Sequence, residues 1–204
     1  MTQTSRTPEH RLCVYCGSSP GRNPNHMQAA TALGTAMAKA GIGLVYGGGS
    51  IGLMGATAKA VLESGGHVTG IIPQFLVQKE RMLDGVNDLI VTSSMHERKT
   101  LMFEKATGFV ALPGGIGTLE ELAEITTWAQ LNQHAKPIIV ADFDGYWDHL
   151  LKLLDHMRAE QFIRADTDVF LDVAKSVDDV IQLYRERLSK ARPKVPLAAI
   201  RQQL

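Results

Sequence analysis

Four charged residues in two short segments carry the side chains that cleavage of a glycosidic bond requires: Arg98 and Lys99 in MHERK, and Glu120 and Glu121 in TLEE. Breaking the bond between the anomeric carbon of ribose and a base nitrogen builds positive charge on the sugar ring. Glu121 can stabilise that charge or take a proton from the attacking water. The planar fork of Arg98 can orient the carboxylate or pair with phosphate and ribose hydroxyls. Lys99 can add a point charge toward the same phosphate, and no comparable acid is evident for the leaving base.

Each of these residues also has a structural interpretation. Thr118 and Glu121 have the spacing of a capping box, in which the two side chains satisfy backbone N–H groups at a helix start. Arg98 and Lys99 can simply solvate the outer face of a helix. The chemical interpretation therefore depends on what lies beside these residues in the fold.

Three glycine-rich segments follow predicted strands: CGSSPG at 16–21, YGGGSIGLMG at 46–55 and PGGIGT at 113–118. Open parallel sheets bind ligands at the carboxyl ends of their strands, which is where such segments lie. Glycine lets backbone N–H groups approach an oxyanion closely, and the following helix directs the positive end of its dipole to the same point. Glycines also make tight turns without any ligand. Three such segments in one sheet favour a phosphorylated ligand.

A dinucleotide enzyme is an alternative, because Gly47, Gly49 and Gly52 satisfy GxGxxG between a predicted strand and a predicted helix. An NAD site also needs an acidic residue about 20 positions further on, at the end of the next strand, to bind the ribose 2′-OH. That stretch reads HVTGIIP at 67–73 and contains no acid. A redox enzyme using NAD(P) therefore rests on the glycines alone.

The elements that must position these residues alternate between strand-length apolar runs and helical patterns, which predicts a βαβ chain with a parallel sheet. We predict an α/β fold, a Rossmann-like doubly wound parallel sheet in a single domain over 11–190. An extended or disordered segment 1–10 precedes it, and a surface tail 191–204 follows it. The predicted strands cover 11–16, 42–46, 67–72, 88–92, 108–112 and 136–141, with a further short one near 169–173. The predicted helices cover 23–41 and 51–64, begin at Ser94 and at Thr118, and lie near 145–160 and 176–190.

Composition narrows the classes of partner. Lys plus Arg and Asp plus Glu number 21 each, so no net field attracts DNA, RNA or an anionic membrane. No apolar run reaches the roughly 20 residues that cross a bilayer, and we predict a cytoplasmic protein. Cys13 and Cys16 form a CxxC, but they lie in an apolar strand pattern on opposite faces, and no second CxxC exists. We interpret both as buried strand residues.

PGGIGTLEE at 113–121 matches the PGGxGTxxE signature of the Lonely guy (LOG) family, whose members were once labelled lysine decarboxylases. MHERK at 95–99 resembles the Arg-Lys motif of that family at its usual distance upstream. CGSS at 16–19 and YGGGSIGLMG also look like its phosphate-side loops. The resemblance therefore covers residues 11–185, which is far more specific than a lone GxGxxG.

The resemblance implies a cytokinin riboside 5′-monophosphate phosphoribohydrolase, with AMP as a common alternative substrate and free base and ribose 5-phosphate as products. It also implies a homodimer with sites near the subunit interface and no cofactor, and we assign no metal site. By motif position, Arg98 and Glu121 are its catalytic pair. The substrate-binding positions are Ser18, Gly48, Gly49, Glu80, Arg98, Lys99, Gly114, Gly115, Ile116, Gly117, Thr118, Leu119, Glu120, Glu121 and Thr127.

Two further hypotheses use the same residues differently. A nucleotide-binding or sensor module on this scaffold needs the glycine segments but no chemistry, since one fold serves many functions. A decarboxylase needs pyridoxal phosphate on a lysine, with an acidic or arginine partner for the ring nitrogen. Lys59, Lys99 and Lys105 are available for that role, but nothing in the sequence marks one of them as desolvated.

Overall fold

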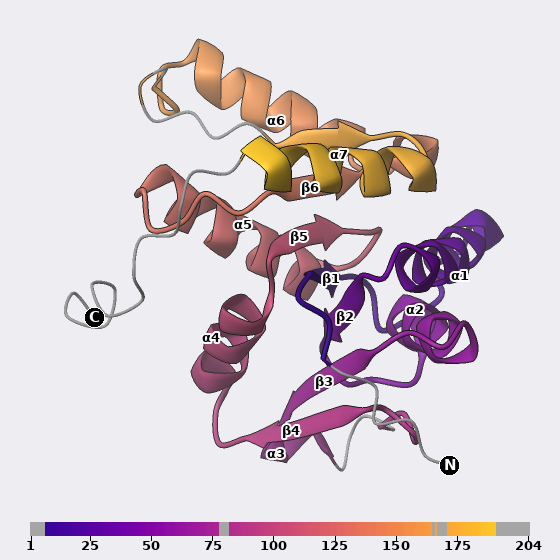
Figure 1. The fold of residues 1–204 in the computed structure, drawn as a ribbon. Helices are drawn as coiled ribbons and strands as arrows, with labels where there is room; N and C mark the ends of the chain where they lie inside the picture. Colours follow the sequence, from indigo (N-terminus) through magenta and orange to yellow (C-terminus); the bar gives the residue numbers. More distant parts are fainter. Residues whose placement is uncertain (1–6, 78–81, 165, 167–170, 191–204) are drawn as a thin grey trace.

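Seven parallel strands form one sheet in the computed structural model, which describes residues 7–77, 82–164, 166 and 171–190. The strand order is β4-β3-β2-β1-β5-β6-β7, so the chain moves outward from β1 to β4 and then returns to the other side of β1 (Figure 1). The strands are β1 Arg11–Tyr15, β2 Gly43–Tyr46, β3 Val68–Pro73, β4 Asp88–Thr92, β5 Gly108–Ala111, β6 Ile138–Ala141 and β7 Asp172–Ala174. The Rossmann-like doubly wound sheet is therefore confirmed. Glu80, the segments 1–6 and 191–204, and the start of the predicted strand near 169–173 lie outside the described residues.

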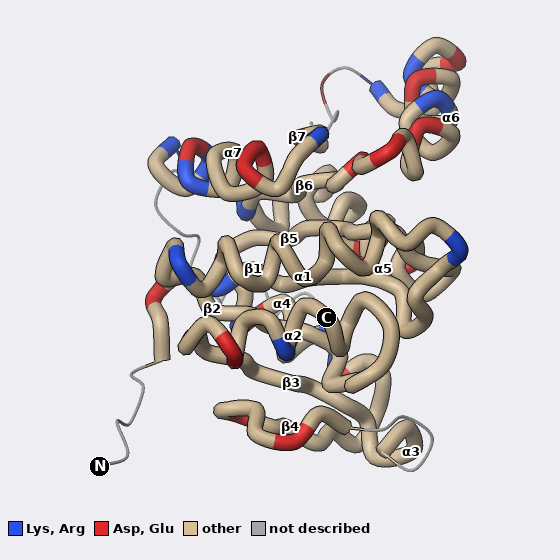
Figure 2. The backbone as a smooth tube through the Cα atoms, turned by 90° about the vertical axis from the view of Figure 1, so that its right-hand side faces the viewer, with Lys and Arg blue, Asp and Glu red and all other residues tan. Residues whose placement is uncertain are grey.

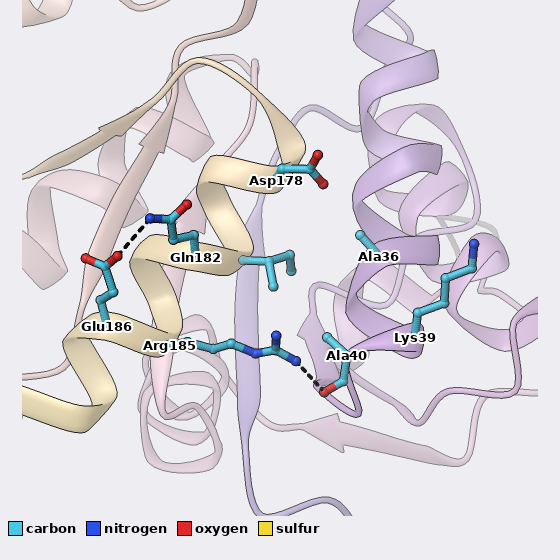
Figure 3. Close-up of a pocket in the computed structure, with 8 residues that line it drawn as sticks. Ala36, Lys39, Ala40, Asp178, Gln182, Arg185 and Glu186 are labelled. Carbon is cyan, nitrogen blue, oxygen red and sulfur yellow. Dashed lines mark hydrogen bonds between the residues drawn. The ribbon is translucent and has the colours of Figure 1, made fainter.

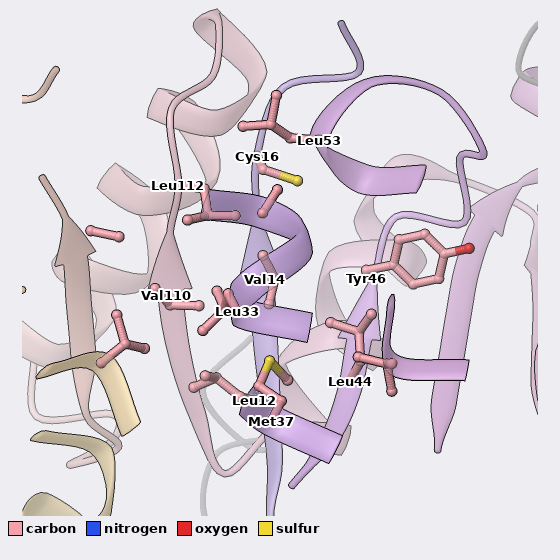
Figure 4. Close-up of a cluster of buried hydrophobic side chains, with 14 of the residues drawn as sticks. Leu12, Val14, Cys16, Leu33, Met37, Leu44, Tyr46, Leu53, Val110 and Leu112 are labelled. Carbon is pink, nitrogen blue, oxygen red and sulfur yellow. The ribbon is translucent and has the colours of Figure 1, made fainter. Parts of the chain in front are cut away.

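Helices cover both faces of this sheet, which explains why its central strands read as continuous apolar runs. They are α1 Pro24–Lys39, α2 Gly52–Glu63, α3 Gln74–Val77, α4 Met95–Lys105, α5 Ile116–Gln130, α6 Asp148–Ala159 and α7 Val177–Lys190. The core on one face packs α1, α2 and α7 against the sheet (Figure 4). The core on the other face packs α4 and α5 against it. Cys16 lies in the first core and Cys13 in the second, so both cysteines are buried on opposite faces as predicted.

Two predicted helix starts are confirmed by their caps. The Asn23 side chain accepts a hydrogen bond from the Asn25 N–H at 3.0 Å, and Pro24 occupies the first helical position. The Ser94 hydroxyl accepts from the Glu97 N–H at 3.2 Å. The Glu97 carboxylate reaches back one residue further than in a capping box and accepts from the N–H of Ser93 at 2.7 Å.

The predicted start of the fourth helix is wrong. Helix α5 begins at Ile116 rather than Thr118, and its N-cap is Gly115, which has no capping side chain. Glu121 is therefore one turn beyond the position that a capping box requires, and its carboxylate makes no capping hydrogen bond. The structural interpretation of this glutamate is thus removed.

Helix α4 crosses one face of the sheet, because it connects the edge strand β4 to β5, which lies beyond β1 in the strand order. It packs against β3, β2 and β1 on the way. The start of α4 lies at the carboxyl ends of β2 and β3, where Arg98 donates to the carbonyls of Ile71 and Gly47, on the face that α5 also covers.

Charges on the outer helices are mixed in sign. Lys and Arg segments alternate with Asp and Glu segments along α6 and α7 (Figure 2). Arg187 pairs with Asp172, and Arg158 pairs with Asp155. Among the residues that the structure describes, no helix has the length and apolar character to span a bilayer.

Candidate active site

The three glycine segments meet at the carboxyl ends of β1, β2 and β5. The Gly17 N–H donates to the Pro113 carbonyl at 3.0 Å, and the Leu53 N–H donates to the Gly17 carbonyl at 3.1 Å. A Cβ on Gly114 would lie 2.1 Å from the Thr118 hydroxyl oxygen and 2.9 Å from the Gly17 nitrogen. Only glycine therefore allows the segments 16–21 and 113–118 to approach this closely.

The helix starts beside these segments differ in what their N–H groups bind. The first turn of α2 is occupied, because both Leu53 and Met54 donate to the Gly17 carbonyl. At α5 the N-cap Gly115 offers no side-chain acceptor, and a Cβ on Gly115 or Gly117 would meet no atom within 4 Å. The first N–H groups of a helix have no intrahelical partner, and at α5 no side chain caps them. At α2, the Gly17 carbonyl occupies the N–H groups that a dinucleotide would use. The predicted phosphate site is therefore the start of α5 rather than that of α2.

Arg98 is held by two hydrogen bonds at the carboxyl ends of β2 and β3. Its side chain is only 5% exposed, and its Nε donates to the Ile71 carbonyl of β3 at 3.2 Å. Its Nη2 donates to the carbonyl of Gly47, directly after β2, at 3.4 Å. A Cβ on Gly47 would lie 2.1 Å from that Nη2 atom. The first glycine of the GxGxxG pattern thus makes room for a guanidinium rather than for a pyrophosphate.

Glu121 lies on α5 at the same face of the sheet, and only 7% of it is exposed. Burial raises the pKa of its carboxyl group from the usual 4.5 to about 7; the charge of Arg98 acts in the opposite direction, and that of Glu120 adds to the rise. Arg98 and Glu121 are therefore in electrostatic range, although they form no direct hydrogen bond or ion pair. A carboxyl group with this pKa changes its protonation state near neutral pH, as a catalytic acid or base does.

A family model described as "Possible lysine decarboxylase" matches residues 54–184. The protein named cytokinin riboside 5′-monophosphate phosphoribohydrolase LOG, from Oryza sativa subsp. japonica, is 48% identical over 161 residues, which is 79% of this chain and 66% of that protein. Cytokinin riboside 5′-monophosphate phosphoribohydrolase LOG2, from Arabidopsis thaliana, is 41% identical over 180 residues, which is 88% of this chain and 84% of that protein. The chain belongs to the LOG family.

The fold of this LOG-family chain is also found in a solved structure, the Moco carrier protein from Chlamydomonas reinhardtii. Its TM-score is 0.69, and the match covers 91% of this chain and 99% of that one at 24% sequence identity. At this identity the likeness establishes the fold alone. Function is therefore argued from the site.

Lys99 is paired with two glutamates of α5, and its role toward a phosphate stays a prediction. Its Nζ lies 2.6 Å from Glu120 Oε1 and 2.9 Å from Glu124 Oε1, which joins α4 to α5. Burial alone would lower the pKa of Lys99, but the hydrogen bonds to the two glutamates raise it above its usual value. A lysine that forms a Schiff base needs the opposite shift, so the pairing argues against Lys99 as a decarboxylase lysine. Glu124 was missed by the sequence analysis, although its i, i+4 spacing from Glu120 was a usable signal.

The other LOG-motif positions differ in how far they are buried. Thr118 is buried against Gly114, whereas Gly115, Ile116 and Gly117 are exposed at the start of α5 and Leu119 is half-buried. The remaining four described positions lie in other environments, and their roles stay predictions: Ser18 is exposed, Gly48 and Gly49 are buried beside β2, and Thr127 is exposed with its hydroxyl donating to the Ala123 carbonyl.

A separate groove lies away from these residues. It lies between α1 and α7 (Figure 3). Its α1 side is formed by Ala36, Lys39 and Ala40 at the end of that helix. The groove therefore lies on the sheet face that α1 and α7 cover, whereas MHERK and PGGIGTLEE begin α4 and α5 on the other face.

Proposed function

We propose that this LOG-family chain hydrolyses the N-glycosidic bond of purine nucleoside 5′-monophosphates, namely cytokinin riboside monophosphates or AMP, to free base and ribose 5-phosphate. The observation that carries the proposal is the placement of Glu121, a buried carboxyl group with Arg98 in electrostatic range and the uncapped start of α5 on its own helix. The names of the rice and Arabidopsis relatives support the substrate class.

Each part of the site has a role in the proposed reaction. The N–H groups at 115–118 bind the 5′-phosphate, because a helix start with no cap attracts an anion. Side chains on a helix lean toward its N-terminus, so the Glu121 carboxylate leans toward the sugar of a nucleotide anchored there. As the bond from C1′ to the base breaks, its electron pair leaves with the base, which takes up a proton from solvent, and water attacks C1′. The Glu121 carboxylate stabilises the positive ring and accepts a proton from that water.

Incubation with AMP and with isopentenyladenosine monophosphate, followed by chromatography, tests the proposal. We expect free adenine or N6-isopentenyladenine together with ribose 5-phosphate in equal amounts. Tight nucleotide binding by calorimetry without release of any base would contradict hydrolysis and favour the sensor module. Comparing kcat/KM for the two substrates then identifies the preferred base, which apolar pocket shape decides.

The pH profile follows from the raised pKa of Glu121. The carboxylate form is the active one, so we expect kcat/KM for AMP to rise with pH through an ascending limb near pH 7. An ordinary glutamate would place this limb near pH 4.5, where the rise is complete well before neutrality. Initial rates at low substrate between pH 5 and 9 measure it, and a flat profile from pH 5.5 to 8 would contradict the assignment.

We also propose a homodimer and a cytoplasmic location. Glu120, Glu124 and Thr127 share one face of α5 at i, i+4 and i+7, and the ends of this helix expose Ile116 and Leu131. A second subunit on this face would cover both apolar side chains and place Thr127 at the subunit boundary. Light scattering that gives the mass of one chain at micromolar concentration would contradict the dimer.

A further inference from the structure

Tyr146 connects a fourth segment of the chain to the proposed phosphate site. It lies between β6 and α6, and its hydroxyl donates to the Gly114 carbonyl at 2.6 Å. The Tyr146 side chain is 40% exposed, so its position is not explained by burial in a core. Neither the chain's motifs nor the roles derived above use this residue.

The hydrogen bond fixes one particular peptide group. The Gly114 carbonyl and the Gly115 N–H belong to the same planar trans peptide unit, in which the C=O and N–H bonds point in opposite directions. Holding the carbonyl against Tyr146 therefore directs the Gly115 N–H away from it. Gly115 is the N-cap of α5, so this N–H stands beside the free N–H groups of the first turn.

Tyr146 itself is held in place from several sides. The neighbouring Asp144 carboxylate accepts hydrogen bonds from the side-chain amides of Asn23 at 3.0 Å and Asn25 at 2.9 Å, at the start of α1. The ring of His26 meets the Tyr146 ring edge-on, with 5.3 Å between the ring centroids. A rigid support of this kind lets a hydroxyl set the orientation of its partner rather than follow it.

We propose that Tyr146 is a positioning residue that orients the Gly114–Gly115 peptide, so that the Gly115 N–H joins the N–H groups binding the 5′-phosphate. The proposal rests on the proposed function, because it concerns the phosphate end of that substrate. Glycine at 115 has no side chain to hinder rotation of this peptide, and a Cβ there would meet no atom within 4 Å. Without the tyrosine hydroxyl the peptide is free to turn its N–H away.

The Tyr146→Phe variant tests this by separating phosphate affinity from chemistry. Loss of one hydrogen bond, about 1 kcal/mol, corresponds to a five- to tenfold rise in KM for AMP. We expect kcat to stay within about twofold of wild type, since Glu121 and Arg98 are untouched. As competitive inhibitors, ribose 5-phosphate should weaken by the same factor as KM, and adenosine, which lacks the phosphate, should be unchanged.

Tyr184→Phe is the matched control, because it also loses a hydroxyl hydrogen bond, the one to Thr107, and Tyr184 lies on α7, on the sheet face opposite α5. It should leave all three constants unchanged. A Tyr146→Phe variant with unchanged KM, with a loss confined to kcat, or with equal weakening for adenosine would overturn the proposal. Calorimetric titration with ribose 5-phosphate tests the role of Tyr146 separately from hydrolysis. If the wild type releases no base, the proposed hydrolysis is wrong, but weaker binding of ribose 5-phosphate by the variant still supports the role of Tyr146. If the wild type does not bind ribose 5-phosphate, the proposed role of Tyr146 is overturned.

Discussion

Glu121→Gln is expected to lower kcat for AMP by about a hundredfold or more while it leaves nucleotide affinity within a few-fold of wild type. The glutamine keeps the size and shape of the side chain but can neither stabilise a positive ring by charge nor accept a proton from water. Single-turnover rates and calorimetry on the same preparation measure the two effects separately. A variant that retains more than a tenth of the wild-type kcat would remove Glu121 from the chemistry.

The same substitution should raise the stability of the chain at pH 8 although it lowers activity. Measuring stability therefore distinguishes a loss of chemistry from misfolding of the variant. The folded chain holds the Glu121 proton more tightly than the unfolded chain, since burial raises the pKa from 4.5 to about 7. This contribution to stability is complete below pH 4.5 and is lost as the pH rises through about 7. The difference corresponds to about 3 kcal/mol at most.

Glu121→Gln has no carboxyl group to ionise, so it avoids this loss. We expect the variant to unfold at the wild-type denaturant midpoint near pH 4.5 and at a higher midpoint at pH 8. Glu63→Gln, on the exposed end of α2, is the control and should match wild type at both pH values. A Glu121→Gln midpoint that lies below wild type at pH 8 would show that the carboxylate is needed for packing instead.

The sheet and the main helices were predictable because their causes are local. Buried parallel strands such as Leu12–Tyr15 have no polar face to confuse the pattern, and Asn23-Pro24 specifies a helix start by its own chemistry. The start of α5 was misplaced for the same local reason. Thr118 and Glu121 fit a capping box by spacing, but Gly115 begins the helix earlier and Thr118 packs on Gly114 instead.

The site was only partly predictable, because its finer contacts depend on how helices cross. Arg98 and Glu121 were found from their types, yet the role of Gly47 follows only from α4 passing beneath β2. Lys99 was singled out from its type, but its pairing with Glu120 and Glu124 follows only from the approach of α4 to α5. Tyr146 gave no signal of this contact, because the sequence places it in the predicted helix near 145–160, whereas α6 begins only at Asp148.

Arg98 is expected to be the second residue that the reaction cannot lose. Arg98→Lys retains a positive charge, but a single ammonium cannot reproduce a fork that donates to both Ile71 and Gly47. Loss of one preorganised donor group costs on the order of a hundredfold in kcat/KM. Steady-state kinetics on AMP measure the loss, and a Lys variant within threefold of wild type would show that the charge alone suffices.

Arg98→Met separates the charge from the geometry. The Arg98 charge lowers the pKa of Glu121, against the larger effect of burial, so its removal should raise that pKa further. The ascending limb of the pH profile should then move above its wild-type position near pH 7, whereas in Arg98→Lys it should move much less.

Gly47→Ala tests the position of the Arg98 guanidinium without altering any charge, because the new Cβ would lie 2.1 Å from Nη2 and displace it. If the alanine variant has wild-type kcat/KM, the position of the guanidinium is unimportant and Arg98 acts by long-range charge alone.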